Sequence, residues 1–131
     1  MTNIREELDA VFRDVSAAFA RGLGAAAVAE RLYVDPVVVV GEGNPAAARG
    51  LAQFLPQLAD LIEGWGFSPT LTFTLVDPIL AAESVATTFV AVEVAPPGVG
   101  AVVERYRVLY GWTRTSRGWR VALEMFDAGQ F

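Results

Sequence analysis

The sequence predicts an α+β fold, in which three helices come first and lie on one face of a curved antiparallel sheet. Two observations predict it. Up to about residue 66, apolar residues recur at helical spacing in three segments, with one short strand among them. Beyond that point the segments are rich in β-branched and aromatic residues and are joined by turn-like sequences. Helices followed by a run of strands are typical of the α+β class, and the length of 131 residues predicts a single domain over residues 1–131.

The predicted helices have recognisable ends. Asn3 can cap the first helix, with Glu6 in the capping-box position. Its apolar residues are Ile4, Leu8, Val11, Phe12, Val15 and Phe19. A short second helix is expected from about Ala25 to Tyr33, because Asp35-Pro36 stops it. Helical spacing marks the third at Leu51, Phe54, Leu55, Leu58, Leu61, Ile62 and Trp65. Pro56 falls inside this helix and predicts a kink or a later start.

The strands form two groups. Val37 to Val40 is β-branched throughout and predicts a strand between the second and third helices. Four more strands are expected at Thr70–Asp77, Glu83–Ala95, Val102–Thr115 and Gly118–Asp127. The segments DPILAAE and TSRG indicate turns, so these four strands predict a strongly bent antiparallel meander. Alternation along them places Trp112 and Trp119 on the face that the helices cover.

The composition is unusually apolar for so small a domain. Hydrophobic residues make up 53% of the chain and charged residues 19%. Either the fold encloses an apolar cavity or a partner covers one face. Thr88, Val90, Val92 and Val94 alternate along one side of a long strand, and we expect a homodimer joined through the outer face of the sheet.

Charge and hydropathy limit the other partners. The net charge of −5 gives the wrong sign of field for nucleic acid, so no nucleic acid partner is expected. No apolar run approaches the length of a membrane span, so no membrane partner is expected either. The charged, periodic N-terminus does not resemble a secretory signal, which predicts a cytoplasmic location.

Three residue types are absent: the chain contains no cysteine, no histidine and no lysine. This excludes thiol nucleophiles, imidazole bases, Schiff-base lysines and ordinary zinc sites. Chemistry by the chain itself would have to use Asp, Glu, Tyr and Arg. We expect neither a metal nor a cofactor.

Gly41, Gly43 and Ala46 match the G-x-G-x-x-G/A spacing of a dinucleotide-binding loop. That fold also needs parallel strands alternating with helices, and an acidic residue about twenty positions after the glycines. Here the next strand ends at Asp77, too far along the chain, and no further strand–helix unit follows. We therefore interpret the motif as a turn between a strand and a helix.

Two segments together match the pattern of a known family. They are Arg31 to Leu55, RLYVDPVVVVGEGNPAAARGLAQFL, and the C-terminal Gly118 to Phe126, GWRVALEMF. Tyr33 and Asp35 end the second helix, a strand follows, and Gly50 opens the third helix. In this order they resemble the nuclear transport factor 2-like superfamily, in its SnoaL-like and ketosteroid isomerase-like branch. Pro36 stands where the family often has a second aspartate. The resemblance covers essentially the whole chain and implies a cone-shaped α+β barrel with a small apolar ligand in its mouth, and often a homodimer.

The catalytic residues of ketosteroid isomerases do not carry over. Those enzymes use an aspartate base with a tyrosine and a protonated aspartate as hydrogen-bond donors. By the resemblance, the base position falls on Gly41 and the tyrosine position near Val15. The protonated acid falls near Tyr110. Because two of the three roles are missing, the sequence does not predict a ketosteroid isomerase.

A tight TSRG turn predicts the pairing of the last two strands. Trp112 would pair with Val121, Tyr110 with Leu123, Val108 with Met125 and Tyr106 with Asp127. The inward face would then be aromatic and aliphatic, with Tyr106, Tyr110 and Asp127 as its polar groups. The expected ligand-contacting residues are Tyr106, Tyr110, Trp112, Phe54, Leu58, Trp65, Phe73 and Met125. Trp112 also fits plain core packing.

Three functions are consistent with this sequence. The first is a small-molecule-binding domain whose apolar, aromatic-lined pocket takes a small apolar or aromatic molecule. The second is an isomerase, cyclase or hydratase that acts on an apolar substrate, with Asp127 or Glu104 as acid or base. The third is a dimeric interaction module with a filled core.

Overall fold

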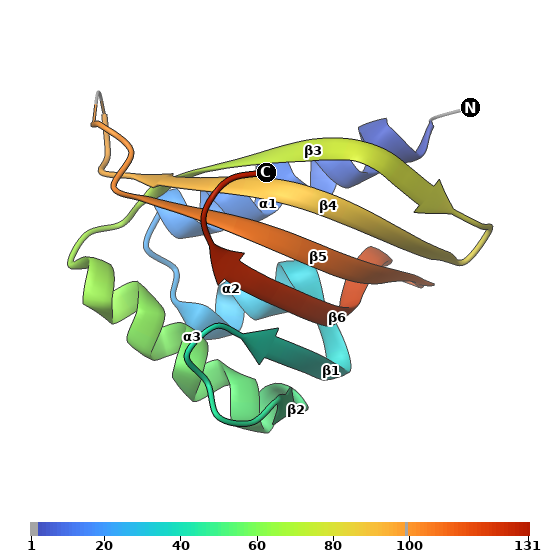
Figure 1. Cartoon of the computed structure of the whole chain (residues 1–131), viewed down its shortest axis with the longest axis horizontal. Helices are drawn as coiled ribbons and strands as arrows, with labels where there is room; N and C mark the ends of the chain where they lie inside the picture. The colour runs from blue at the N-terminus through green and yellow to red at the C-terminus, as the bar shows by residue number, and fades with distance from the viewer. Residues whose placement is uncertain (1–2, 99) are drawn as a thin grey trace.

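The computed structural model describes residues 3–98 and 100–131, and it confirms the α+β class (Figure 1). The helices are α1 (Ile4–Ala20), α2 (Ala25–Leu32) and α3 (Leu51–Trp65). The strands are β1 (Tyr33–Gly41), β2 (Ala48–Arg49), β3 (Thr70–Ala81), β4 (Val85–Ala95), β5 (Glu104–Thr115) and β6 (Gly118–Ala128). Within the described ranges, no helix has the length and apolar character needed to span a bilayer.

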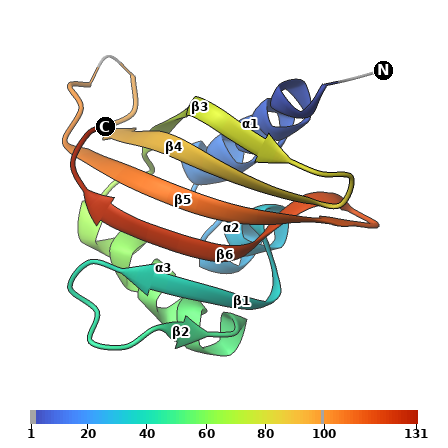
Figure 2. The same ribbon diagram turned by 45° about the vertical axis from the view of Figure 1, so that its right-hand side comes forward.

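The strands form one curved, open sheet in the order β2-β1-β6-β5-β4-β3, and the helices cover its concave face (Figure 2). The four C-terminal strands pair antiparallel, as predicted. β1 joins this meander by pairing parallel with β6, and the short β2 pairs antiparallel with β1. The sheet is therefore mixed, and the parallel pair brings the first strand beside the last.

Local interactions explain how the helices begin. The Asn3 side chain accepts a hydrogen bond from the Glu6 amide at 2.9 Å, which confirms the predicted N-cap of α1. α3 begins at Leu51 and passes through Pro56. Its capping residue Gly50 has φ 87°, a conformation that favours glycine. The Leu51 amide donates to Asp35 Oδ1 at 3.0 Å, so Asp35 ties the start of α3 to β1.

The core lies between the helices and the concave face of the sheet. Phe12 of α1 stacks on Phe73 of β3, with ring centroids 4.8 Å apart. Trp112 and Trp119 are both buried there, as predicted. Thr88, Val90, Val92 and Val94 also face the helices and are buried. The expectation that these four residues lie on an outer, dimer-forming face is therefore wrong.

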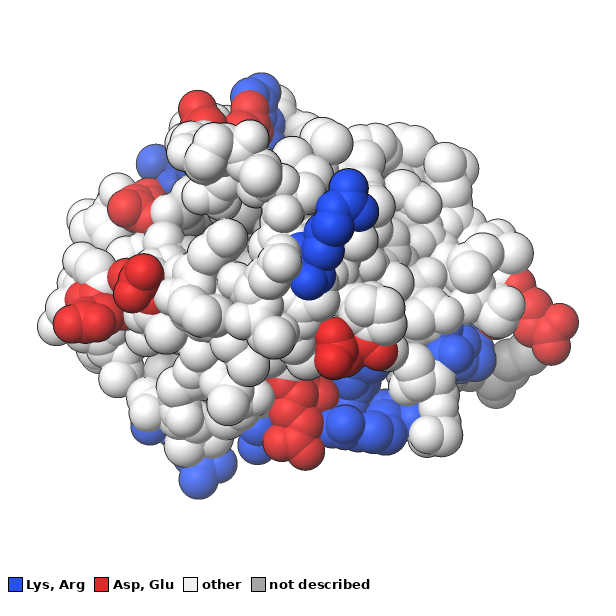
Figure 3. Space-filling view, turned by 90° about the horizontal axis from the view of Figure 1, so that it is seen from below, with Lys and Arg blue, Asp and Glu red and all other residues white. Residues whose placement is uncertain are grey.

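The outer face of the sheet is only partly charged. Arg105 and Arg107 lie on it, as the predicted register of β5 requires. Apolar side chains lie beside them, including Val40, Leu123 and Met125, which are 40%, 43% and 53% exposed. Seen from below, on another side of the molecule, broad uncharged areas also separate the charged side chains (Figure 3). The exposure of Val40, Leu123 and Met125 shows that the apolar composition extends to the outer face of the sheet.

The segment predicted as a DPILAAE turn is mostly strand. β3 continues through Asp77-Pro78 to Ala81, and a register shift between Val76 and Leu80 accommodates the irregularity. β3 is an edge strand, so a proline there removes no hydrogen bond from the interior of the sheet. The turn itself is confined to residues 82–84.

A β-bulge in β6 changes which residues face the core. Trp112 pairs with Val121 as predicted, but Gly111 pairs with Leu123, so Ala122 is an extra residue on β6. Beyond the bulge, Tyr110 pairs with Glu124, Val108 with Phe126 and Tyr106 with Ala128. The predicted pairs with Leu123, Met125 and Asp127 are therefore wrong by one residue. Because side chains alternate between faces, Glu124 and Phe126 turn inward.

Candidate functional site

A cavity of about 320 Å³ lies between the helices and the concave face of the sheet. Its walls are mostly apolar and include six of the predicted ligand-contacting residues: Phe54, Leu58, Trp65, Phe73, Tyr106 and Tyr110. Four further lining residues, Glu42, Asn44, Gln57 and Leu61, are exposed to solvent. These four mark the mouth, which therefore lies between the β1–β2 loop and α3.

Glu124 is the one buried carboxyl among the described lining residues, and the sequence prediction missed it. It is 6% exposed, and Tyr33 Oη donates a 2.6 Å hydrogen bond to its Oε1. Burial raises the pKa of Glu124 to about 7, although the hydrogen bond from Tyr33 opposes this rise. At neutral pH the group can therefore either hold or release a proton.

Tyr110 lies near Glu124 on the neighbouring strand β5 and is 3% exposed. Burial, together with the nearby charge of Glu124, raises the Tyr110 pKa well above its ordinary value, so the phenol stays protonated. Its hydroxyl hydrogen-bonds to no other described residue. A buried phenol normally finds a partner, and the cavity is where a ligand can supply one.

Phe126 occupies the space beside Gly41, the position that the family resemblance assigns to a catalytic base. A Cβ atom built on Gly41 would lie 2.5 Å from the Phe126 ring and 2.8 Å from Asn44 Nδ2. Phe126 also packs edge-on against Tyr106, with centroids 6.0 Å apart. An aromatic ring on this wall therefore excludes the aspartate of the isomerases, and the carboxyl in the cavity comes from β6 instead.

Glu104, one of the two predicted acid–base candidates, lies at the rim of the cavity. It is exposed and accepts hydrogen bonds from Trp65 Nε1 at 3.0 Å and from the Tyr106 hydroxyl. Burial and the hydrogen bond from the Tyr106 hydroxyl to Glu104 raise the Tyr106 pKa. Through the hydrogen bond from Trp65, Glu104 links the C-terminal end of α3 to β5 beside the cavity.

Three predicted site residues lie outside the cavity. Asp127, the other acid–base candidate, faces outward, where Arg107 Nε donates to its Oδ1 at 2.9 Å and Arg107 Nη2 to its Oδ2. These bonds lower the Asp127 pKa. Met125 faces outward as well. Trp112 is part of the core, where its Nε1 donates to Thr88 Oγ1 at 2.8 Å. The bulge at Ala122 displaces the first two, and core packing accounts for the third.

Residues 3–98 and 100–131 contain no group of three or more acidic side chains that could hold a metal ion. The titratable groups that line the cavity are the buried carboxyl of Glu124, with a pKa of about 7, the exposed carboxyl of Glu42 at the mouth, and the phenols of Tyr33, Tyr106 and Tyr110.

Comparison with known proteins gives matches in structure but not in sequence. No protein-family model matches the chain, and no curated protein matches it. An NTF2-like protein with a cystatin-like fold from Novosphingobium aromaticivorans superposes with a TM-score of 0.67, at 21% identity, over 95% of this chain and 80% of that one. A ketosteroid isomerase-like protein from Erwinia carotovora superposes with a TM-score of 0.62, at 20% identity, over 96% of both chains. The chain has the NTF2-like fold.

A third solved structure extends this comparison. A protein from Catenulispora acidiphila, solved in complex with S-DNPA, has a TM-score of 0.74 and 18% identity. The match covers 95% of this chain and 92% of that one. Sequence identities this low show the shared fold alone, so the argument about function depends on the cavity itself.

Proposed function

We propose that the cavity binds a small apolar or aromatic molecule that carries one oxygen, and that the Tyr110 hydroxyl, or the Glu124 carboxyl when it is protonated, donates a hydrogen bond to this oxygen. One observation carries the proposal: the polar groups of Tyr110 and Glu124 face a space whose walls are mostly apolar. A ligand that offers the Tyr110 hydroxyl an acceptor gains a hydrogen bond in these largely apolar surroundings.

The cavity walls indicate where the affinity would come from. A volume of about 320 Å³ is at the small end of ligand pockets and suits a compact ring system. Burial of apolar ligand surface contributes about 25 cal/mol per Å², before the costs of association. One hydrogen bond to Tyr110 adds about 1 kcal/mol, or about fivefold in affinity, and orients the ligand.

The structural comparisons support this proposal at the level of the fold. One protein with the same fold was solved in complex with S-DNPA, and another is ketosteroid isomerase-like. The presence of a cavity also counts against an interaction module with a filled core.

A displacement titration tests the proposal. An uncharged fluorescent hydrophobic probe would first be bound, and then displaced by an aromatic ketone or by a hydrocarbon of the same shape. Wild type should prefer the ketone about fivefold, and Tyr110→Phe should lose that preference. Val108→Trp, in which the larger side chain fills the cavity, should bind neither the probe nor the two competitors. Asp127→Asn is the control and should behave as wild type, because Asp127 faces outward. Equal binding of probe by wild type and Val108→Trp would refute the proposal.

A second function, proton transfer, is favoured by the near-neutral pKa of Glu124. Ionised Glu124 would take a proton from the carbon next to a ligand carbonyl, while the Tyr110 hydroxyl hydrogen-bonds to the enolate oxygen. The protonated Glu124 would then return the proton to carbon. Exchange of ketone α-hydrogens in heavy water measures this cycle. Glu124→Gln should abolish it and Asp127→Asn should not, whereas exchange that survives in Glu124→Gln would exclude the role.

We also propose a homodimer that forms through the outer face of the sheet. Val40, Leu123 and Met125 form an exposed apolar strip there. The ion pairs Arg107–Asp127 and Arg105–Glu93 also lie on this face. A twofold axis would place this strip against its own copy, with residues of both charges at the border. The cytoplasmic location and the lack of a nucleic acid or membrane partner stay predictions from the sequence.

A further inference from the structure

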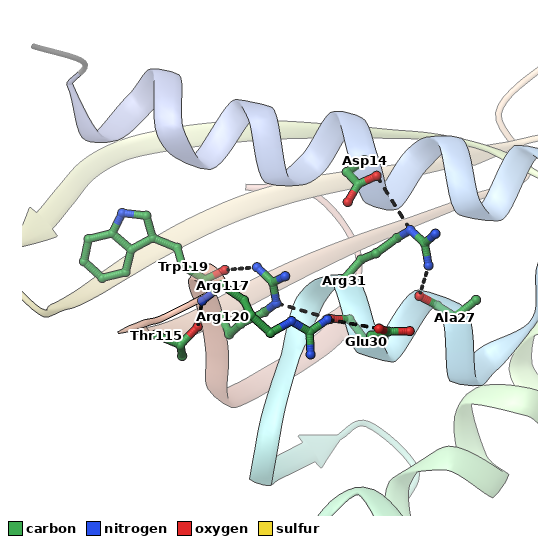
Figure 4. Close-up of polar contacts among 8 residues, drawn as sticks. All are labelled: Asp14, Ala27, Glu30, Arg31, Thr115, Arg117, Trp119 and Arg120. Atoms are coloured by element: carbon green, nitrogen blue, oxygen red, sulfur yellow. Dashed lines mark hydrogen bonds and ion pairs between the residues drawn. The ribbon is translucent and has the colours of Figure 1, made fainter.

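A second cavity, of about 240 Å³, is lined by charged side chains. Figure 4 shows that these side chains come from α1, α2 and the hairpin that joins β5 to β6. The lining consists of Asp14, Glu30, Arg31, Arg117 and Arg120. None of these residues lines the apolar cavity, which α2 borders through Val28 and Leu32. The polar cavity is therefore a separate feature, and neither proposed function makes use of it.

Carbonyl oxygens hold its three guanidinium groups in place. Arg31 Nη1 donates to Ala27 O at 2.7 Å. Arg117 Nη2 and Arg120 Nε both donate to Glu30 O, at 3.0 and 3.2 Å. The Glu30 carbonyl lies near the C-terminal end of α2, where the helix dipole favours cations. The arginines are thus positioned before any ligand arrives.

The positive charge in this cavity is only partly neutralised. Arg31 pairs with Asp14 at 3.6 Å and Arg117 with Glu30 at 3.2 Å. Arg120 donates to Glu30 O and to Trp119 O, but it forms no ion pair with any described residue. Three arginines face two carboxylates, which leaves an excess of one positive charge on a chain whose net charge is −5.

The pKa of Arg120 shows that its charge is only partly compensated. Partial burial lowers the Arg120 pKa, and the like charge of Arg117 lowers it further, although the charges of Asp14 and Glu30 oppose this shift. Two guanidinium groups beside the same carbonyl repel each other unless an anion lies between them. Each also has N–H groups that no described residue accepts, and release of the Glu30 carboxylate would free a further Arg117 Nη2–H for an anion.

We propose that Arg117 and Arg120 form a binding site for a small oxyanion, the carboxylate or phosphate group of a ligand. Arg31 lies at the border of this site and contributes to its charge. The Glu30 side chain is 64% exposed and can turn toward solvent when an anion replaces it beside Arg117. Because this site lies outside the apolar cavity, an experiment can refute the oxyanion proposal without refuting the proposed function of the cavity.

Titration with inorganic phosphate and, separately, with acetate tests the site, with the arginine Nε–H resonances followed by NMR at constant ionic strength. At least one anion should shift the Arg117 and Arg120 signals saturably. A saturable shift with phosphate alone would indicate that the ligand carries a phosphate group. A saturable shift with acetate alone would indicate a carboxylate. Arg120→Gln and Arg117→Gln should each weaken binding at least about tenfold, because each removes one fork of donors. Arg105→Gln, on the outer face of the sheet, is the matched control and should not weaken it.

Two outcomes would overturn the proposal. One is the absence of a saturable shift with either anion, and the other is equal weakening by Arg105→Gln and Arg120→Gln. If Arg120→Gln does not fold, Arg117→Gln decides the question, because the Arg117 side chain is 56% exposed and contributes little to the core.

Discussion

The Tyr33 hydroxyl donates a 2.6 Å hydrogen bond to Glu124 Oε1, although 91 positions separate the two residues in the sequence. Tyr33 begins β1 and Glu124 lies in β6, so the bond crosses the parallel strand pair of the sheet. It also orients the buried carboxyl of the apolar cavity. Stability, protonation and ligand binding should therefore all respond to changes at this pair.

Glu124 should make stability depend on pH. Its pKa is about 7 in the folded chain and 4.5 for an ordinary glutamate, so the folded state binds the proton more tightly. Stability from this group is complete below about pH 4.5 and is lost as pH rises through 7, by on the order of 3 kcal/mol. Urea unfolding from pH 4 to 9 should show this loss in wild type but not in Glu124→Gln.

Glu63→Gln, a change at an exposed glutamate, is the control and should keep the wild-type profile. A free-energy difference between wild type and Glu124→Gln that stays constant over this range would show that Glu124 titrates at an ordinary pKa.

Tyr33→Phe should raise the pKa of Glu124 above about 7, because the hydrogen bond that favours the carboxylate is lost. The ring keeps its edge-on contact with Phe54, at a centroid distance of 5.1 Å. The cost in stability should be about 1–3 kcal/mol at high pH, where Glu124 is charged, and smaller at low pH. Titration of the Glu124 carboxyl carbon by NMR measures the pKa. An unchanged or lower value would contradict the account.

Gly41→Ala should cost about 1–3 kcal/mol, because its new Cβ would lie 2.5 Å from the Phe126 ring. Gly41 does not have a positive φ, so the cost comes from contact and not from backbone strain. In a double-mutant cycle with Phe126→Ala, the cost of Gly41→Ala should fall markedly. Strictly additive effects would show that the Phe126 ring does not occupy this space.

Met125→Glu should dissociate the proposed dimer, because it buries a charge in the apolar strip of the outer face. Sedimentation equilibrium at micromolar concentration should find a dimer for wild type and a monomer for the variant. Leu23→Glu is the matched control, since Leu23 is 41% exposed between α1 and α2. A monomeric wild type would exclude the dimer and leave the apolar strip without an assigned partner.

The order and type of the elements could be predicted from the sequence because helical and alternating spacing report burial directly. The boundaries of α3 and the inward face of β5 agree with those predictions. The parallel β1–β6 pair could not be predicted, since nothing local in either strand specifies its neighbour. The strand character of residues 78–81 depends on pairing with β4, which overrides the turn propensity of Asp77-Pro78.

The candidate site was harder to predict, because one extra residue reverses the face of every side chain beyond it. The bulge at Ala122 moves Asp127 outward and Glu124 inward, and the residues on either side of Ala122 in β6, Val121 and Leu123, include no glycine or proline that would mark it. One signal does point to Glu124. In VALEMF it is the single charged residue in an otherwise apolar stretch, and such a residue needs either a buried partner or an exposed face.

The most direct test of the central claim is a crystal structure of the chain saturated with a bicyclic aromatic ketone. We predict that the ketone lies in the apolar cavity, with its oxygen within hydrogen-bonding distance of Tyr110 Oη or of the Glu124 carboxyl. A ketone bound only outside this cavity, or an empty cavity at saturating ligand, would contradict the account.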